Sequence, residues 1–180
     1  MLEVITDTGP DWPASTDWDA LAQRAVQAAM CQTPNGELIG KPVCVEVSIK
    51  LSNDAEIQQL NAAYRGKDRP TNVLSFPMIQ ADLLPGIENT DDGEVLLGDI
   101  ILAHETCARE AGERGIALAD HATHLIVHGT LHLLGHDHEH DSEADAMEAL
   151  EIRALETLGL PDPYGDREHG HARPIDEQGT

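Results

Sequence analysis

The sequence predicts a single α/β (α+β) domain built from about four strands and about five helices. Its 180 residues fit one domain and can bury a substantial core. Segments in which every second residue is apolar alternate along the chain with segments whose apolar residues have helical spacing. A run of predicted helices completes the second half. Apolar residues make up 41% of the chain and aromatic residues only 3%, so the core is expected to be aliphatic. This order of elements indicates strands and helices packed in layers.

The first half of the chain is expected to supply two strands and two helices. Residues 2–5 can form a short strand, and apolar residues at helical spacing predict a helix over residues 16–30. The segment 43–51 alternates valine, isoleucine and leucine with polar residues, which is the clearest strand signal in the chain. A second helix then begins at a cap residue, either Ser52 or Asn53.

The second half is expected to supply two more strands and three helices. The strands are 72–76 and 95–102, separated by an exposed loop over 79–93 that contains glycine, proline and several acids. The helices are expected over residues 104–112, 118–134 and 141–158. Residues 1–160 then form the domain, and the polar residues 161–180 are expected to be a disordered tail.

The chain is strongly acidic, with 11 basic and 33 acidic residues and a formal net charge of −22. This charge repels phosphate backbones at long range and argues against a non-specific nucleic-acid-binding protein. The basic residues are unevenly distributed, since Arg65, Lys67 and Arg69 lie within five positions. A local basic patch on an acidic protein is therefore compatible with the composition.

The sequence is expected to belong to a cytoplasmic protein. No stretch approaches the ~20 apolar residues that cross a bilayer, and the N-terminus lacks a basic segment followed by an apolar one. Cys31, Cys44 and Cys107 are widely spaced and form no C-x-x-C pair. This spacing suits reduced thiols better than a disulfide framework.

Seven of the ten histidines lie between residues 121 and 140, and two of them form a candidate metal-binding pair. His128 and His132 are four residues apart within the apolar helix predicted over 118–134. Four residues complete about one helical turn, so both imidazoles project from one face and can reach a common ion at ~2.0–2.1 Å.

A third histidine follows at the spacing of a catalytic zinc site. Gly135 is expected to end the helix, and His138 lies three residues further on. The pattern H-x-x-x-H-x-x-G-x-x-H is the ligand spacing of metzincin metalloproteases, whose general base is a glutamate directly after the first histidine. Gly129 occupies that position, so the ligands are retained while the peptidase base is absent. Three imidazoles leave the ion an open coordination position, as a hydrolytic zinc site requires.

The other histidines have simpler interpretations. A single histidine on an apolar helix is usually a hydrogen-bonded core residue, and His104, His121 and His124 are expected to be of this kind. His136 and His140 flank the third ligand and compete with it for that role. We interpret them as polar residues that solvate the turn.

Four segments together resemble the YbeY family of bacterial endoribonucleases. They are HGTLHLLGHDH (128–138), YRGKDRPTNVLSFP (64–77), LLGDIILA (96–103) and EADAMEALE (143–151). The family signature usually has tyrosine where His136 stands, a departure that touches no ligand position. The resemblance covers roughly residues 43–158.

The resemblance implies a zinc-dependent, single-strand-specific endoribonuclease. Such an enzyme takes part in ribosomal RNA maturation, at the 3′ end of the small-subunit RNA, and in ribosome quality control. Its partners are single-stranded ribosomal RNA and the ribosome or its small subunit. Carried over to this sequence, the ligands of one zinc ion per chain are His128, His132 and His138, and the functional arginine is Arg65. The family fold is a mixed sheet of about four strands with helices packed on it.

Arg65 has a clear chemical use beside such a metal. Phosphodiester cleavage builds negative charge on the non-bridging oxygens, and a guanidinium offers them a planar fork of donors. Lys67 and Arg69 are candidate contacts to the RNA backbone. Without the neighbouring metal motif, a solvated turn would be the simpler interpretation of all three residues.

Asp99 and Asp137 are candidates for a carboxylate that orients a metal-bound histidine, since such histidines generally donate their other N–H to a carboxylate or carbonyl. Asp99 follows Gly98 in an apolar strand, and Asp137 lies inside the histidine motif. The sequence does not choose between them. It identifies no general base, so a water molecule and the RNA 2′-hydroxyl are both candidate nucleophiles.

Two other functions compete with the ribonuclease interpretation. A zinc peptidase or amidohydrolase is favoured by the acidic net charge and disfavoured by Gly129. A non-catalytic ribosome-assembly factor would hold zinc in a closed site, which needs a fourth ligand such as His136, His140 or a cysteine. No cysteine lies near the motif in the sequence.

Overall fold

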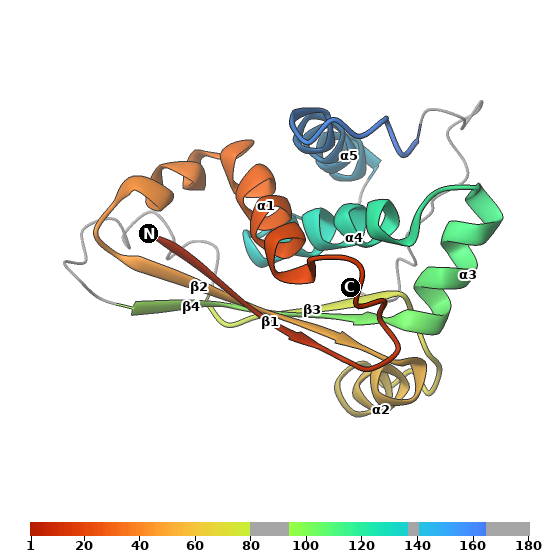
Figure 1. Ribbon diagram of the computed structural model, residues 1–180. Helices are drawn as coiled ribbons and strands as arrows, with labels where there is room; N and C mark the ends of the chain where they lie inside the picture. The colour runs from red at the N-terminus through yellow and green to blue at the C-terminus, as the bar shows by residue number, and fades with distance from the viewer. Residues whose placement is uncertain (80–93, 137–140, 165–180) are drawn as a thin grey trace.

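A four-stranded sheet lies between layers of helices in the computed structural model, which describes residues 1–79, 94–136 and 141–164 (Figure 1). The strands are β1 Leu2–Thr8, β2 Cys44–Ser52, β3 Val73–Pro77 and β4 Glu94–Ala103. Their order across the sheet is β1-β2-β4-β3. Strands β1, β2 and β4 are parallel, and the edge strand β3 runs antiparallel to β4. This mixed sheet confirms the predicted fold class.

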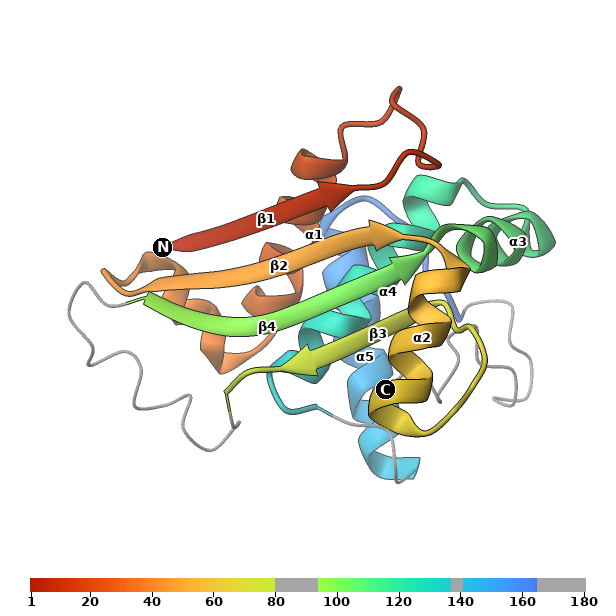
Figure 2. The same cartoon turned by 90° about the horizontal axis from the view of Figure 1, so that it is seen from below.

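Helices cover both faces of the sheet. The bounds are α1 Trp18–Cys31, the 3-10 helix η1 Pro34–Gly40, α2 Asp54–Arg65, α3 His104–Arg114, α4 Leu118–Leu133 and α5 Asp141–Thr157. Helices α1 and α4 lie on one face with α5 outside them, while α2 covers the other face (Figures 1 and 2). Across the described segments, no helix combines the length and apolarity needed to cross a membrane. Most of the loop predicted over 79–93 lies outside the described residues.

The sheet divides the apolar core into two unequal clusters. The larger cluster fills the space between the sheet and helices α1, α4 and α5. The smaller one joins the sheet to α2 and consists of Ile57, Leu74, Ile101 and Ala103. Helix α4 is buried on every side from His121 to Leu133. Polar side chains on α4 must therefore find partners inside the protein.

Gly98 allows α4 to pack closely on the sheet. The pairing of β2 with β4 shifts register next to Gly98, which has a φ of 156°. A Cβ atom at this position would lie 2.5 Å from the carbonyl oxygen of Phe76 and 2.6 Å from Cδ2 of Leu133. Leu133 is in the last turn of α4, so a side chain at position 98 would force the helix away from the sheet.

We expect Gly98→Ala to lower the free energy of unfolding by about 2–5 kcal/mol, because backbone strain and steric overlap add. The corresponding fall in Tm is roughly 5–20 °C, measurable by thermal unfolding. Gly112→Ala in α3 is the matched control, since no atom lies within 4 Å of a Cβ there. The control should keep or slightly raise Tm. An unchanged Tm in Gly98→Ala would refute this explanation of the close packing.

The domain extends past the boundary predicted at residue 160. Tyr164 is buried at 8% exposure, and its hydroxyl donates a hydrogen bond to Glu151 Oε1 at 2.9 Å. The prediction of a disordered tail is therefore wrong for residues 161–164. The prolines of this segment suggested a tail, but Pro163 and Tyr164 lie in a turn in which the backbone N–H of Tyr164 donates to Asp162 Oδ1 at 2.7 Å. Residues 165–180 lie outside the described part of the chain.

Candidate active site

Four histidines form a buried stripe along α4. His121, His124, His128 and His132 follow one another at intervals of three or four residues, which places them on one face of the helix. The side chains of all four are buried. Helix α4 lies between the sheet and α5, so this stripe runs through the middle of the molecule (Figure 1).

The two predicted ligands on α4 point at a common position. Nε2 of His128 and Nε2 of His132 are 3.0 Å apart, and the ring centroids are separated by 4.5 Å at an interplanar angle of 73°. Two imidazole nitrogens bound to one tetrahedral zinc ion lie about 3.3 Å apart, given Zn–N distances of about 2.0–2.1 Å. The pair therefore fits a shared metal ion with a change of only a few tenths of an ångström.

The third predicted ligand, His138, lies outside the described residues, as do Asp137 and His140. Within the described segments, no cluster of three or more His, Cys, Asp or Glu side chains suited to a metal is found. Helix α4 ends as predicted, with Gly135 at a φ of 96° and the backbone N–H of His136 bonded to the carbonyl of Leu131 at 3.0 Å. Burial lowers the pKa of His136, which favours its neutral form.

A carboxylate that the sequence did not indicate lies behind the histidine pair. Glu151 of α5 is 1% exposed, and its Oε1 lies 3.4 Å from Nδ1 of His128. The same oxygen is 2.6 Å from Nε2 of His124. The signal that could have revealed it is its position: Glu151 lies in the buried stripe of α5 that also contains Met147 and Leu155. An acid at helical spacing among core residues needs a polar partner.

The pKa of Glu151 is lowered in spite of its burial. Burial by itself raises the pKa of a carboxyl group, but the electrostatic interaction with His128 and the hydrogen bond from His124 outweigh it and hold the pKa of Glu151 well below its usual range. An ionised carboxylate can only accept hydrogen bonds, so it favours N–H groups on the ring atoms that face it.

A second histidine–carboxylate pair involves α4 but neither of the predicted ligands. Nε2 of His121 is 2.8 Å from Oε1 of Glu110 on α3, and the side-chain amide of Asn72 donates to the same oxygen at 3.0 Å. His104 contacts Trp12 edge to face, with 5.3 Å between ring centroids. These contacts confirm His121 as a hydrogen-bonded core residue, whereas His104 is half-buried and packs against the core through its ring.

Gly129 faces the sheet. A Cβ atom at this position would lie 3.0 Å from Cγ2 of Ile100 on β4. The position that carries the general base in metzincins is therefore filled by the contact between α4 and the sheet. A glutamate there would have to push aside the buried side chain of Ile100.

Arg65 is attached to the edge strand β3 from the α2 side of the sheet. Its Nη2 donates to the carbonyl oxygen of Ser75 at 3.1 Å, and its guanidinium lies 5.9 Å from the ring centroid of Phe76. Burial lowers the pKa of Arg65, although a guanidinium stays protonated at neutral pH. Helix α4 packs against β3 from the other face (Figure 1). Arg65 and the histidine pair thus approach β3 from opposite sides.

Lys67 and Arg69 lie in the loop that follows α2. The side-chain amide of the buried Asn61 donates to the carbonyl of Arg69 at 3.0 Å and folds this loop against the helix. Lys67 is half-buried and Arg69 is exposed. The basic residues are therefore grouped with Arg65 on the α2 side.

Asp99 lies apart from the histidines. After the register shift in β4, residues 99, 101 and 103 share one face, and Ile101 and Ala103 pack under α2. The strand pairing also places Asp99 opposite Phe76 of β3. Asp99 consequently belongs to the Arg65 side of the sheet, and its predicted role in orienting a metal ligand on α4 is not supported by this position.

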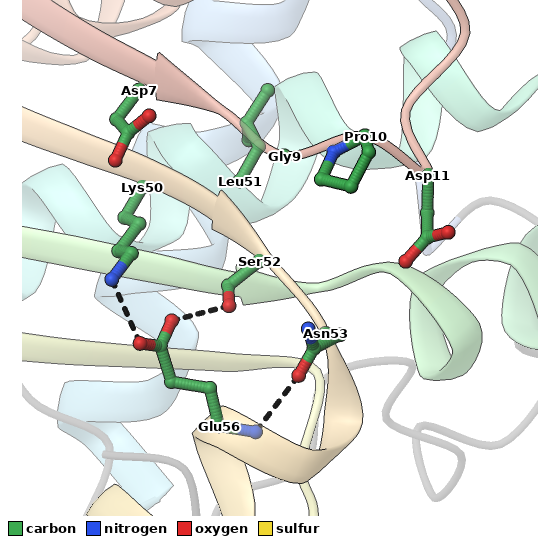
Figure 3. Close-up of a pocket in the computed structure, with 9 residues that line it drawn as sticks. All are labelled: Asp7, Gly9, Pro10, Asp11, Lys50, Leu51, Ser52, Asn53 and Glu56. Atoms are coloured by element: carbon green, nitrogen blue, oxygen red, sulfur yellow. Dashed lines mark hydrogen bonds and ion pairs between the residues drawn. The ribbon is translucent and has the colours of Figure 1, made fainter.

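A separate cavity of about 220 Å³ opens where β1 and β2 end and α2 begins (Figure 3). Its lining residues are Asp7, Gly9, Pro10, Asp11, Lys50, Leu51, Ser52, Asn53 and Glu56. Nζ of Lys50 lies 2.7 Å from Glu56, whose carboxylate also accepts from the Ser52 hydroxyl. These hydrogen bonds, from Lys50 and then Ser52, lower the pKa of Glu56. The cavity contains none of the predicted site residues.

Comparisons with known proteins agree with the fold and the motif. A family model described as endoribonuclease YbeY matches residues 11–159. The chain is 60% identical over 164 residues to a protein of Rhizorhabdus wittichii and 56% identical over 168 residues to one of Sphingopyxis alaskensis, both named endoribonuclease YbeY. These matches cover 91% and 93% of this chain and 97% and 100% of the two relatives.

The solution structure of TM1509 from Thermotoga maritima has a similar fold, with a TM-score of 0.52 at 22% sequence identity. The similarity covers 96% of this chain and 100% of that one. The fold, the histidine motif on α4 and the match of the family model along most of the chain lead to one conclusion: this chain belongs to the YbeY family of endoribonucleases.

Proposed function

We propose that this protein is a cytoplasmic zinc-dependent endoribonuclease that cleaves single-stranded ribosomal RNA. Within the family's activity, the proposed substrate is the 3′ end of the small-subunit RNA precursor. The proposed roles are maturation of that RNA and ribosome quality control. The ribosome or its small subunit would be the partner that presents the RNA.

The convergence of His128 and His132 is the observation that supports zinc most strongly. Their Nε2 atoms are 3.0 Å apart, and both side chains are buried on α4. Together with His138 they would supply three neutral nitrogen ligands to one ion per chain. A zinc ion bound there would act as a Lewis acid toward the scissile phosphate.

Arg65 is proposed to bind the phosphate directly. A guanidinium has five N–H donors. The bond from Nη2 to the Ser75 carbonyl uses one of these and fixes the group at the β3 edge. Because the histidine pair lies on the other side of β3, an RNA strand would have to pass along this edge to reach both. Lys67 and Arg69 lie on the same side as Arg65 and are proposed to contact neighbouring phosphates.

The net charge of −22 is compatible with this function. An acidic surface disfavours RNA everywhere except at the grouped basic residues, which restricts how the substrate can approach. Binding is consequently expected to depend on few phosphate contacts and to have a shallow salt dependence.

A peptidase is the weaker candidate. The metzincin base would have to stand at position 129. An added Cβ atom there would lie only 3.0 Å from the side chain of Ile100. The carboxylate of Glu151, which contacts Nδ1 of His128 at 3.4 Å, is buried behind the ring. It is therefore badly placed to activate a nucleophile on the ligand side.

Metal removal tests the proposed function. Treatment with a strong chelator is expected to reduce cleavage of a single-stranded small-subunit precursor RNA at least about a hundredfold, since the Lewis acid supplies several kcal/mol. One equivalent of Zn²⁺ should restore the rate and Mg²⁺ should not. The same RNA annealed to its complement is the control for strand specificity. Undiminished cleavage after chelation, or equal cleavage of the duplex, would contradict the proposal.

A further inference from the structure

Three polar groups from two segments of the chain converge on one carboxylate oxygen in the core. Oε1 of Glu151 lies 2.6 Å from Nε2 of His124, 2.9 Å from the hydroxyl of Tyr164 and 3.4 Å from Nδ1 of His128. Glu151 is on α5, the two histidines are on α4, and Tyr164 follows α5 in the chain. Glu151 is 1% exposed, so protein groups and not bulk water determine its hydrogen bonds.

This arrangement fixes the position of the oxygen. The Tyr164 hydroxyl and the His124 ring both lie within hydrogen-bonding distance of Oε1 and hold this oxygen in place. The oxygen that they hold faces Nδ1 of His128, whose other ring nitrogen faces His132 at 3.0 Å. Contacts thus lead from Glu151 to His128 and from His128 to His132, which connects the buried carboxylate with the predicted ligand position.

We propose that Glu151 is a positioning residue for the metal ligand His128. The carboxylate keeps the proton of His128 on Nδ1 and leaves the lone pair of Nε2 directed toward the metal position. Histidine ligands generally need such an acceptor for their second N–H, because it fixes the tautomer and the ring orientation. This inference rests on the proposed zinc-dependent function.

The same helix provides a matched control. His121 and Glu110 form a buried pair at 2.8 Å, also between α4 and a neighbouring helix, but His121 is not a predicted ligand. If buried His–Glu pairs on α4 served only to join helices, Glu151→Gln and Glu110→Gln would have the same effects.

The test measures zinc affinity by chelator competition and the tautomer of His128 by ring ¹⁵N chemical shifts, neither of which depends on RNA cleavage. Glu151→Gln is expected to weaken zinc binding by about 10–100-fold and to shift His128 toward the Nε2-protonated form. Glu110→Gln should leave the zinc affinity and the His128 shifts as in the wild type. Tyr164→Phe removes one donor but keeps the carboxylate, so its zinc affinity should fall by only about threefold or less.

The outcomes separate the two levels of the proposal. A wild-type protein that binds no zinc would refute the proposed function itself. Zinc binding in the wild type with unchanged affinity and tautomer in Glu151→Gln would refute only the positioning role. If Glu151→Gln does not fold, Glu151→Asp retracts the carboxylate by one methylene group. An affinity and a His128 tautomer equal to wild type in that variant would overturn the inference.

Discussion

Replacing Arg65 by alanine is expected to slow cleavage of a single-stranded RNA by about a hundred- to a thousandfold while zinc content is unchanged. This range corresponds to about 2.7–4 kcal/mol for the loss of one donor to the oxygens that gain charge in the transition state. Arg65 is on the α2 side of β3, bonded to Ser75, whereas the predicted zinc ligands are on α4. Metal binding therefore does not need its side chain.

Two further variants distinguish the chemical role of Arg65 from its charge. Arg65→Lys should recover only part of the rate, because an ammonium group cannot reproduce the bidentate fork. Arg109→Ala removes the same charge from α3, where the side chain is exposed and 3.7 Å from Glu113, and should cleave at the wild-type rate. Cleavage kinetics, zinc content and Tm are to be measured for each variant. Wild-type rates in both Arg65 variants would contradict a role in catalysis. The hydrogen bond from Arg65 to the Ser75 carbonyl of β3 would then be purely structural.

The strands could be predicted where burial differs between their two faces. Strand β2 has neighbours on both sides and alternates over its whole length, so its predicted range of 43–51 is close to the observed Cys44–Ser52. Strand β1 was expected only over residues 2–5 but continues to Thr8. It is an edge strand, and its polar end is fixed by pairing with β2 and not by burial. Such pairing leaves no pattern in the sequence of β1 itself.

The helix η1 was not predicted, since proline, asparagine and glycine in succession usually mark a break. The structure instead uses Pro34 in the first turn, where its missing N–H is not needed. Thr33 caps this turn by accepting a hydrogen bond from the backbone N–H of Asn35 at 3.2 Å. Residues that end one helix can thus begin a 3-10 helix when a cap precedes them.

In the site, too, contacts within one helix could be predicted from the sequence, whereas contacts between helices could not. His128 and His132 could be predicted as a pair because the geometry of one helical turn brings them together. Glu151 could not be assigned to His128, because only the packing of α5 on α4 places it there. The two aspartates considered for that role were Asp137, inside the histidine motif, and Asp99, an acid in an apolar strand. Of these, Asp99 is turned to the other face of the sheet by the register shift beside Gly98.

His132→Ala is expected to abolish zinc binding and, with it, RNA cleavage. Three imidazole ligands form the smallest complete site of this type, and removal of one leaves two, too few to retain zinc during purification. His132 is 8% exposed in the last turn of α4, and its Nε2 faces that of His128. His104→Ala on α3 is the control for loss of a histidine outside the predicted site, since the ring of this half-buried residue contacts Trp12. The control should retain zinc and activity.

Elemental analysis of protein purified without chelator is the most direct test that the α4 histidines hold a catalytic zinc ion. We predict about one zinc per chain in the wild type and in His104→Ala, and close to none in His128→Ala and His132→Ala. Each variant must be shown to be folded by its circular dichroism spectrum. A wild type without zinc, or folded His128→Ala and His132→Ala variants with a full equivalent of zinc, would contradict this assignment.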